Sequence, residues 1–146
     1  MNSDPTTATN VRQAVPFFMV RDIQVSIGFY IDGIGFKMTN SWVDKGRLRW
    51  CWLQLDGASV MLQEYVTQER HISPPEKSSE GVSIYFICED ALIIYETVRS
   101  HGLPVSEPFV GNNMWVVGLK DPDGYNLFFE SATDVPEETR YSHWKK

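Results

Sequence analysis

The sequence DPDGYNLFFE, residues 121–130, carries the strongest fold signal in this chain. Asp, Pro and Gly are residues of tight turns, because Pro fixes φ while Asp and Gly supply the remaining turn geometry. An apolar run over residues 114–119 precedes the turn, and an aromatic strand over residues 125–131 follows it directly. The stretch therefore predicts a hairpin close to the C-terminal end of the chain.

The order of elements that leads to this hairpin occurs twice. Residues 20–22 (VRD) match residues 88–90 (CED). The Asp-Gly turn at 56–57 matches the turn at 123–124 at almost the same spacing. Self-similarity at a fixed spacing indicates a repeated structural unit. Each half is therefore expected to form one β-α-β-β-β module.

Hydrophobic periodicity and turn residues predict the elements of both modules. Asp22 and Asp90 are suited to cap the N-termini of the two helices. In the first module we expect a strand over 14–20, a helix from Asp22 to about 34, and strands over 36–43, 47–55 and 58–64. In the second we expect a strand over 81–88, a helix from Asp90 to 101, and strands over 104–110, 114–119 and 125–131. Residues 1–13 are predicted to be a disordered leader, 67–80 a long loop and 132–146 a charged tail.

A second pattern accompanies the turn. Val20-x-Asp22 is followed by Phe29-Tyr30-x-x-x-Ile34-Gly35-Phe36. With these motifs and the repeat, residues 14–131 resemble the vicinal oxygen chelate superfamily, which includes glyoxalase I, extradiol dioxygenases, and fosfomycin and bleomycin resistance proteins. The resemblance implies a single α+β domain. Its two tandem β-α-β-β-β modules, about 14–66 and 81–131, would form a curved mixed sheet with a concave cleft and helices on the outer face.

The resemblance also implies where metal ligands would lie. In metal-dependent members they come from the first and last strands of each module, and the metal polarises substrate oxygens. The matching positions here are Val15, Met61 or Leu62, Ser83 and Phe128. Apolar side chains cannot hold a hard metal, and serine is a poor ligand. We therefore predict no metal, no other cofactor and no catalytic residue.

Two carboxylates end the last strands of the modules. Glu64 and Glu130 occupy similar places in the two halves, and a shift of the register by a single position would put both on the cleft face. One interpretation is that both are solvated strand ends. The other is a pair of acids at the cleft mouth that attracts a cation. The histidines His71, His101 and His143 lie in a loop, at a helix end and in the tail, and are predicted to be surface residues.

Aromatic side chains make up 13% of the chain, with five Trp, and several share a predicted face with the metal-ligand positions. Phe17 does so on the first strand, and Tyr85 on the first strand of the second module. Trp50 and Trp52 share one face of their strand, which lines either the cleft or the core. An aromatic cleft binds planar or amphipathic molecules by stacking and burial. The predicted ligand-binding residues are Phe17, Trp50, Trp52, Glu64, Ser83, Tyr85, Trp115, Phe128 and Glu130.

Length, charge and cysteine positions narrow the partners and the cellular compartment that we expect for this protein. The chain has 146 residues, enough for one domain, and its net charge of −6 disfavours nucleic acid and anionic membranes as partners. No apolar run approaches the roughly 18 residues of a membrane span, and the polar start lacks the apolar core of a signal peptide. Cys51 and Cys88 lie in apolar runs and are predicted to be buried free thiols. These features predict a cytoplasmic protein.

Among members of the superfamily, the chain is most similar to the bleomycin-resistance class, whose members sequester a cationic, aromatic drug without changing it. The resemblance therefore predicts metal-independent binding of a small aromatic or cationic ligand by a homodimer. One competing hypothesis is a lyase, isomerase or dioxygenase with an atypical metal set, for example Glu64, Glu130 and His71. The other is an interaction module that keeps the fold and binds no ligand.

Overall fold

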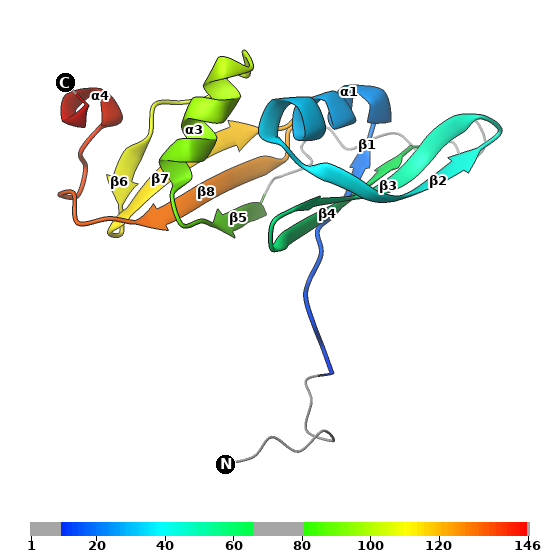
Figure 1. The fold of residues 1–146 in the computed structure, drawn as a ribbon, viewed down its shortest axis with the longest axis horizontal. Helices are drawn as coiled ribbons and strands as arrows, with labels where there is room; N and C mark the ends of the chain where they lie inside the picture. The colour runs from blue at the N-terminus through cyan, green and yellow to red at the C-terminus, as the bar shows by residue number, and fades with distance from the viewer. Residues whose placement is uncertain (1–9, 66–80, 146) are drawn as a thin grey trace.

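A computed structural model describes residues 10–65 and 81–145 of the chain. The strands form two four-stranded mixed sheets, and the helices pack on one face of these sheets (Figure 1). The opposite face carries no helix in the described part of the chain; we call it the open face. The protein is thus an α+β fold of two β-α-β-β-β modules, as the repeat predicts. His71 and the 67–80 loop lie outside the described residues, as do residues 1–9.

The first module forms a sheet with strand order β1-β4-β3-β2. β1 runs parallel to β4, and the other neighbours are antiparallel. The elements in chain order are β1 (Phe17–Val20), α1 (Ile23–Ile27), η2 (Gly28–Ile34), β2 (Lys37–Asp44), β3 (Arg47–Leu55) and β4 (Ala58–Glu64).

The second module repeats this order as β5-β8-β7-β6, again with one parallel pair, β5 with β8. Its elements are β5 (Ser83–Ile87), α3 (Ala91–Ser100), β6 (Phe109–Gly111), β7 (Met114–Lys120) and β8 (Asn126–Ala132), followed by the short helix α4 (Tyr141–Trp144). None of the helices in the described ranges combines the length and the apolar character that crossing a bilayer requires.

The two module helices begin at the predicted capping residues. The side chain of Asp22 accepts a hydrogen bond from the Gln24 amide, and that of Asp90 accepts one from Leu92, both at 3.0 Å. Each cap satisfies an N–H group that the first helical turn leaves without a partner. After α1 the chain continues as the π-helix η2, which ends at Gly35 with φ of 115°, a conformation that favours glycine.

Strand alternation assigns one set of side chains to the core beneath the helices. Cys51 and Leu53 on β3 are fully buried, whereas Trp50 and Trp52 between and beside them are only half-buried. The same alternation separates Leu62 from Met61 on β4. Because successive residues of a strand point to opposite faces, Trp50, Trp52 and Met61 lie on the open face.

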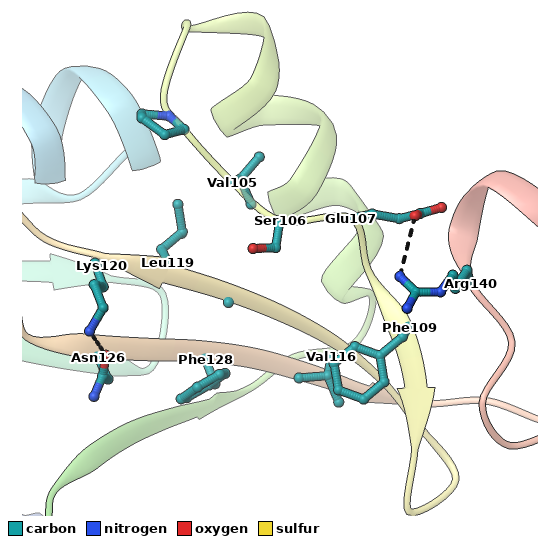
Figure 2. Close-up of a pocket in the computed structure, with 12 residues that line it drawn as sticks. Val105, Ser106, Glu107, Phe109, Val116, Leu119, Lys120, Asn126, Phe128 and Arg140 are labelled. Atoms are coloured by element: carbon teal, nitrogen blue, oxygen red, sulfur yellow. Dashed lines mark hydrogen bonds and ion pairs between the residues drawn. The ribbon is translucent and has the colours of Figure 1, made fainter.

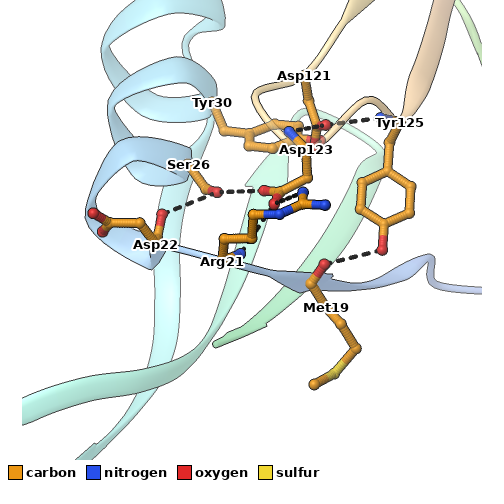
Figure 3. A network of polar contacts seen from close by, with 8 residues as sticks. All are labelled: Met19, Arg21, Asp22, Ser26, Tyr30, Asp121, Asp123 and Tyr125. Atoms are coloured by element: carbon orange, nitrogen blue, oxygen red, sulfur yellow. Dashed lines mark hydrogen bonds and ion pairs between the residues drawn. The ribbon is translucent and has the colours of Figure 1, made fainter. Parts of the chain in front are cut away.

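The Asp-Pro-Asp-Gly turn joins the two modules (Figure 3). Asp121 is buried, and its carboxylate accepts hydrogen bonds from the Asp123 and Tyr125 amides, both at 2.9 Å. It also accepts one from the Tyr30 hydroxyl of the first module, at 2.8 Å. Burial raises the pKa of Tyr30, with the Asp121 charge adding to the rise. The turn motif therefore connects the second module to the first through a buried hydrogen bond.

A second carboxylate of the turn completes this joint. Asp123 accepts hydrogen bonds from the Arg21 backbone amide and from its guanidinium, each at 3.0 Å. The Tyr125 hydroxyl donates to the Met19 carbonyl at 3.0 Å, and its ring stacks on Phe18 with centroids 4.2 Å apart. The end of β1 is thus held by both the charge and the ring that the turn supplies.

Near the end of the strand that follows each Asp-Gly turn, a buried side chain accepts a hydrogen bond from the first backbone amide of a helix. Glu64 accepts from the Ile23 amide at 3.0 Å, and the Ser131 hydroxyl accepts from the Ala91 amide at 2.8 Å. Glu64 also pairs with Arg47 and Arg49, at 2.7 and 3.2 Å. Its predicted place at the cleft mouth is therefore wrong, because it lies on the helix side of the sheet with its charge already compensated.

Two parts of the second module differ from the predictions. A strand over 104–110 is reduced to Phe109–Gly111, because Pro104 and Pro108 have no N–H group with which to join the neighbouring strand. The residues after Ser131 also join the core. Tyr141 is buried against Tyr95 and Trp115, and residues 138–141 form hydrogen bonds with Pro108 and Val110 of the adjoining segment.

Both cysteines are free thiols in the structure. Burial raises the pKa of Cys51 to about 11, and burial also raises the pKa of the partly exposed Cys88. Because the thiolate is the reactive form, we expect a thiol reagent at pH 8 to modify Cys88 first. Cys51 should react only as the chain unfolds. Intact mass spectrometry after timed alkylation measures this; two adducts formed at equal rates on the native protein would contradict the assignment of Cys51 to the core side of β3.

Candidate functional site

The open face of the first module carries two rows of large side chains that run across all four strands. One row, in strand order from β2 to β1, is Asn40, Trp52, Met61 and Phe17. The neighbouring row is Trp42, Trp50, Gln63 and Met19. Residues directly opposite each other on adjacent strands share a face and contact one another. The rows therefore form an apolar, largely aromatic surface with two amide side chains in it.

The second module presents a smaller aromatic surface. Tyr85 on β5 and Phe128 on β8 are opposite each other, and their rings stack with centroids 4.9 Å apart. Gly118 lies across from Phe128 on β7, and a side chain at Gly118 would meet the Phe128 ring at 3.1 Å. A side chain at this position would therefore press on the ring, and glycine leaves room for the ring to lie against the sheet. Ser83 and Glu130 lie on the same face, two residues from Tyr85 and Phe128 respectively.

Three of the four positions that hold a metal in related proteins, Met61, Ser83 and Phe128, lie on this surface and carry no suitable set of donors. Strand register settles the open choice on β4, because Met61 lies opposite Phe17 on the open face and Leu62 is buried in the core. The set is thus Val15, Met61, Ser83 and Phe128, which offers one hydroxyl and no imidazole or carboxylate. Among the described residues, no three His, Cys, Asp or Glu side chains come together as a metal site. These residues do not fit a divalent metal of the kind that the fold suggests.

The structure places seven of the nine predicted binding residues on the open face: Phe17, Trp50, Trp52, Ser83, Tyr85, Phe128 and Glu130. The other two lie on the helix side. Trp115 is buried and packs against Tyr141 and Trp144. It precedes Val116, the residue opposite Glu130, so its side chain points away from that face. Glu64 is the buried partner of Ile23 and two arginines described above.

Sequence reasoning missed Trp42, which lies directly opposite Trp50 and is half exposed. The hairpin pairs Asp44 with Arg47, and an unbroken register would place Trp42 opposite Arg49 on the other face. A bulge between Trp42 and Val43 shifts the pairing by one residue and turns the indole to the open face. No residue type in this stretch signals a bulge, so the pattern alone could not reveal it.

A pocket of about 670 Å³ extends the surface at the outer edge of the second sheet (Figure 2). It forms where β6 is too short to cover β7, between the segment Pro104–Glu107 and the strands β7 and β8. Phe128, Val116 and Gly118 supply its apolar wall on the sheet side. The volume lies in the range of about 300–1,000 Å³ that is typical of small-molecule sites.

The charged groups of this pocket are paired with its own residues. Lys120 donates to the Asn126 side chain at 2.7 Å, and Arg140 lies 3.8 Å from Glu107 (Figure 2). A hydrogen bond from Ser142 lowers the pKa of Glu107, with a smaller contribution from Arg140. The pocket thus has two cationic groups against one carboxylate, so it does not by itself select a cation.

The two histidines in the described ranges, His101 and His143, lie away from the open face. The ring of His101, at the end of α3, is hydrogen-bonded to the Gly33 carbonyl at 2.9 Å and ties that helix to η2. His143 is exposed on the short helix α4.

Comparison with known proteins agrees with this geometry. Residues 12–129 match the family model described as "Glyoxalase/Bleomycin resistance protein/Dioxygenase superfamily". The chain belongs to this superfamily. No curated protein matches its sequence.

Many solved structures share this superfamily's fold. They include the hypothetical protein SA1046 from S. aureus, with a TM-score of 0.63, 20% identity, and coverage of 88% of this chain and 100% of that one. A glyoxalase-related enzyme from Clostridium phytofermentans has a TM-score of 0.64, 14% identity, and coverage of 86% and 98%. TnmS3, an antibiotic binding protein from Streptomyces sp. CB03234, has a TM-score of 0.61, 18% identity, and coverage of 86% and 100%. At such identities the likeness concerns the fold.

Proposed function

We propose that this protein binds a small aromatic or cationic organic molecule on its open face, without a metal and without changing it chemically. The observation that carries the proposal is the aromatic surface around the positions where metal-dependent relatives have ligands. Phe128 and Met61 occupy two of these positions, and on the first sheet Trp52 lies opposite Met61, with Trp50 in the neighbouring row. An antibiotic binding protein among the proteins of similar fold is consistent with this function.

Stacking supplies the attraction in this proposal. Trp50, Trp52 and the Tyr85–Phe128 pair offer flat apolar faces, and each aromatic contact is worth about 0.5–1.5 kcal/mol beyond the burial of its area. Two or three such contacts with a planar ligand, together with the buried area, give micromolar binding in the absence of any covalent or metal bond. Stoichiometric capture requires no more than this.

Glu130 is the acidic group that would attract a cation. It lies on the open face next to Phe128, is half-buried, and its carboxylate has no hydrogen-bond or ion-pair partner among the described residues. Glu64, the second acid predicted for this role, is paired on the helix side. The cationic preference therefore rests on one carboxylate and contributes modestly to affinity.

A homodimer belongs to the same proposal. Phe17, Trp42 and Tyr85 are about half exposed on the open face, at 48%, 52% and 53%. Large exposed apolar side chains on one face are characteristic of an interface or a ligand site. A second copy placed over it would convert the open face into an enclosed cleft.

We place the protein in the cytoplasm, where free thiols such as those of Cys51 and Cys88 persist.

The test is a screen of planar aromatic cations by thermal shift, followed by titration of each hit against Trp50→Ala. We expect at least about tenfold weaker binding, because one buried stacking contact of roughly 1.5 kcal/mol is lost. Trp144→Ala is the matched control, since Trp144 is 45% exposed on α4 and away from the open face. Unchanged affinity in Trp50→Ala would contradict the proposal.

Metal independence is tested separately, by elemental analysis of the protein after incubation with nickel, zinc, manganese and iron(II). One retained ion per chain would overturn metal independence.

A further inference from the structure

The two modules meet at two equivalent joints, and only one of them is filled. At the first joint, the turn at 121–125 contacts the end of β1 and the start of α1 (Figure 3). At the second, the turn at 55–58 lies beside the end of β5 and the start of α3. The strand registers fix the equivalence, because β1 pairs with β4 as β5 pairs with β8. The first joint is therefore a template for what the second could hold.

Two side chains, Tyr125 and Arg21, fill the first joint, and Ser26 lies beside them. The Tyr125 ring stacks on Phe18, 4.2 Å away. The Arg21 guanidinium pairs with Asp123 at 3.0 Å, and the Ser26 hydroxyl lies 3.5 Å from the same carboxylate. An aromatic ring and a cation thus occupy this space together, with the cation against the Asp of the Asp-Gly turn.

The second joint keeps the receiving groups and lacks the filling ones. By the repeat, Asp56 corresponds to Asp123 and Phe86 to Phe18. Ala58 stands where the template has Tyr125, and Glu89 where it has Arg21. A pocket of about 580 Å³ results, and Asp56, Ala58, Phe86 and Glu89 all line it.

The pocket has an acidic rim and an apolar floor. Asp56, Glu89 and Asp90 are its charged lining residues, and no lysine, arginine or histidine of the described ranges lines it. Asp90 caps α3, whereas the carboxylates of Asp56 and Glu89 have no partner among the described residues. The floor is made by aromatic and branched side chains: Tyr85, Phe86, Ile87, Ile93, Ile94 and Phe129. The charges of Asp90 and Asp56 add to the burial that raises the Cys88 pKa, in keeping with a negative potential there.

We propose that this pocket is a second binding site, for a small molecule that joins an aromatic ring to a guanidinium, amidinium or ammonium group. The ring lies against Phe86, as Tyr125 lies against Phe18. The cation pairs with Asp56, as Arg21 pairs with Asp123. The carboxylate can form a charge-assisted contact with the ligand, because the rim holds no cation of the described chain that would compete for it. The site goes beyond the function proposed above, because its recognition groups lie at the joint and not on the Trp50–Phe128 surface.

Benzamidine, which carries a ring and an amidinium, is the probe. We expect saturable amide shifts at residues 55–58 and 85–90 in the 15N-labelled protein. Agmatine, a cation without a ring, and benzoate, a ring with the opposite charge, should each bind at least about tenfold more weakly. Asp56→Asn should weaken benzamidine binding by about tenfold or more, since it removes the charge while Asn tolerates the positive φ of this position.

The decisive variant is Ala58→Tyr with Glu89→Arg, which copies the filling side chains of the first joint into the second. We expect it to remain folded and to abolish the benzamidine shifts. Asp134→Asn, at an exposed acid without a described ion pair, is the charge control and should bind as the wild type does. The proposal is overturned if the wild type shows no saturable shifts, or if they persist in the folded double variant.

Two single variants, Asp56→Asn and Trp50→Ala, distinguish the remaining outcomes. If the double variant does not fold, Asp56→Asn decides, and an unchanged benzamidine affinity overturns the proposal. Trp50→Ala separates the two sites: it should leave the benzamidine shifts at residues 55–58 and 85–90 intact, because Trp50 does not line this pocket. Loss of these shifts in Trp50→Ala, with Asp56→Asn unaffected, would place the probe on the open face and refute the joint site.

Discussion

Replacing Glu64 by alanine is expected to lower the free energy of unfolding by about 3 kcal/mol, because it breaks a buried charge network. The carboxylate is 2% exposed and accepts from Arg47, Arg49 and the Ile23 amide at once. Its loss leaves the first amide of α1 buried without an acceptor and leaves Arg49, 23% exposed, without its anion. Chemical denaturation monitored by circular dichroism measures the change.

Gln63→Ala is the matched control for this experiment. Gln63 precedes Glu64 on the same strand and points to the open face, so its truncation should change stability by no more than about 0.5 kcal/mol. Equal losses in the two variants would mean that Glu64 does not have the buried, paired position described above.

Asp121→Ala is expected to have an effect of similar size, about 3 kcal/mol, through the joint between the modules. Three donors lose their acceptor together: the Tyr30 hydroxyl and the amides of Asp123 and Tyr125. The Tyr30 side chain is fully buried, so water cannot replace the carboxylate there. Tyr30→Phe is the matched variant, since it removes one donor and leaves the acceptor with two; it should cost about 1 kcal/mol in the same denaturation assay.

The pH dependence of this variant has a defined sign. Burial is the largest cause that raises the pKa of Asp121 above its ordinary value of 3.8. The native state therefore binds this proton more tightly than the unfolded chain, and the contribution of Asp121 to stability declines as pH rises through the window above 3.8. The advantage of the wild type over Asp121→Ala should shrink from the acidic end of the folded range toward neutral pH. An advantage that grows with pH would contradict the burial of this carboxyl.

Much of the fold could be predicted because several local signals agreed. The boundaries of β3 and β4 and the starts of the helices follow from turn residues and capping aspartates, which act over a few residues. The superfamily and the order of the strands follow from motifs that the repeat places at matching positions. The extent of β6 could not be predicted from apolar content, since the two prolines prevent pairing although the segment has strand-like composition.

The site was less accessible to prediction, because it depends on register. Glu64 and Glu130 look equivalent in the sequence, but the strand pairings show that Glu64 repeats Ser131 and that Gln63 repeats Glu130. A difference of one residue reverses the face of a side chain, and the same parity misplaced Trp115. Trp50 and Trp52 could not be assigned from sequence, since their neighbours Cys51 and Leu53 are equally apolar. Long-range pairing, which a single sequence does not display, decided all of these cases.

The polar joint of Figure 3 also bears on how the two halves come to fold. Tyr30 of η2 and Arg21 find their acceptors on a turn in the other half of the chain, and the Tyr30 hydroxyl donates to the buried carboxylate of Asp121. A half-chain on its own would therefore expose unmatched polar groups and an uncovered apolar interface. We therefore expect that neither repeat folds on its own and that cooperativity across the joint makes both repeats unfold together in a single all-or-none transition.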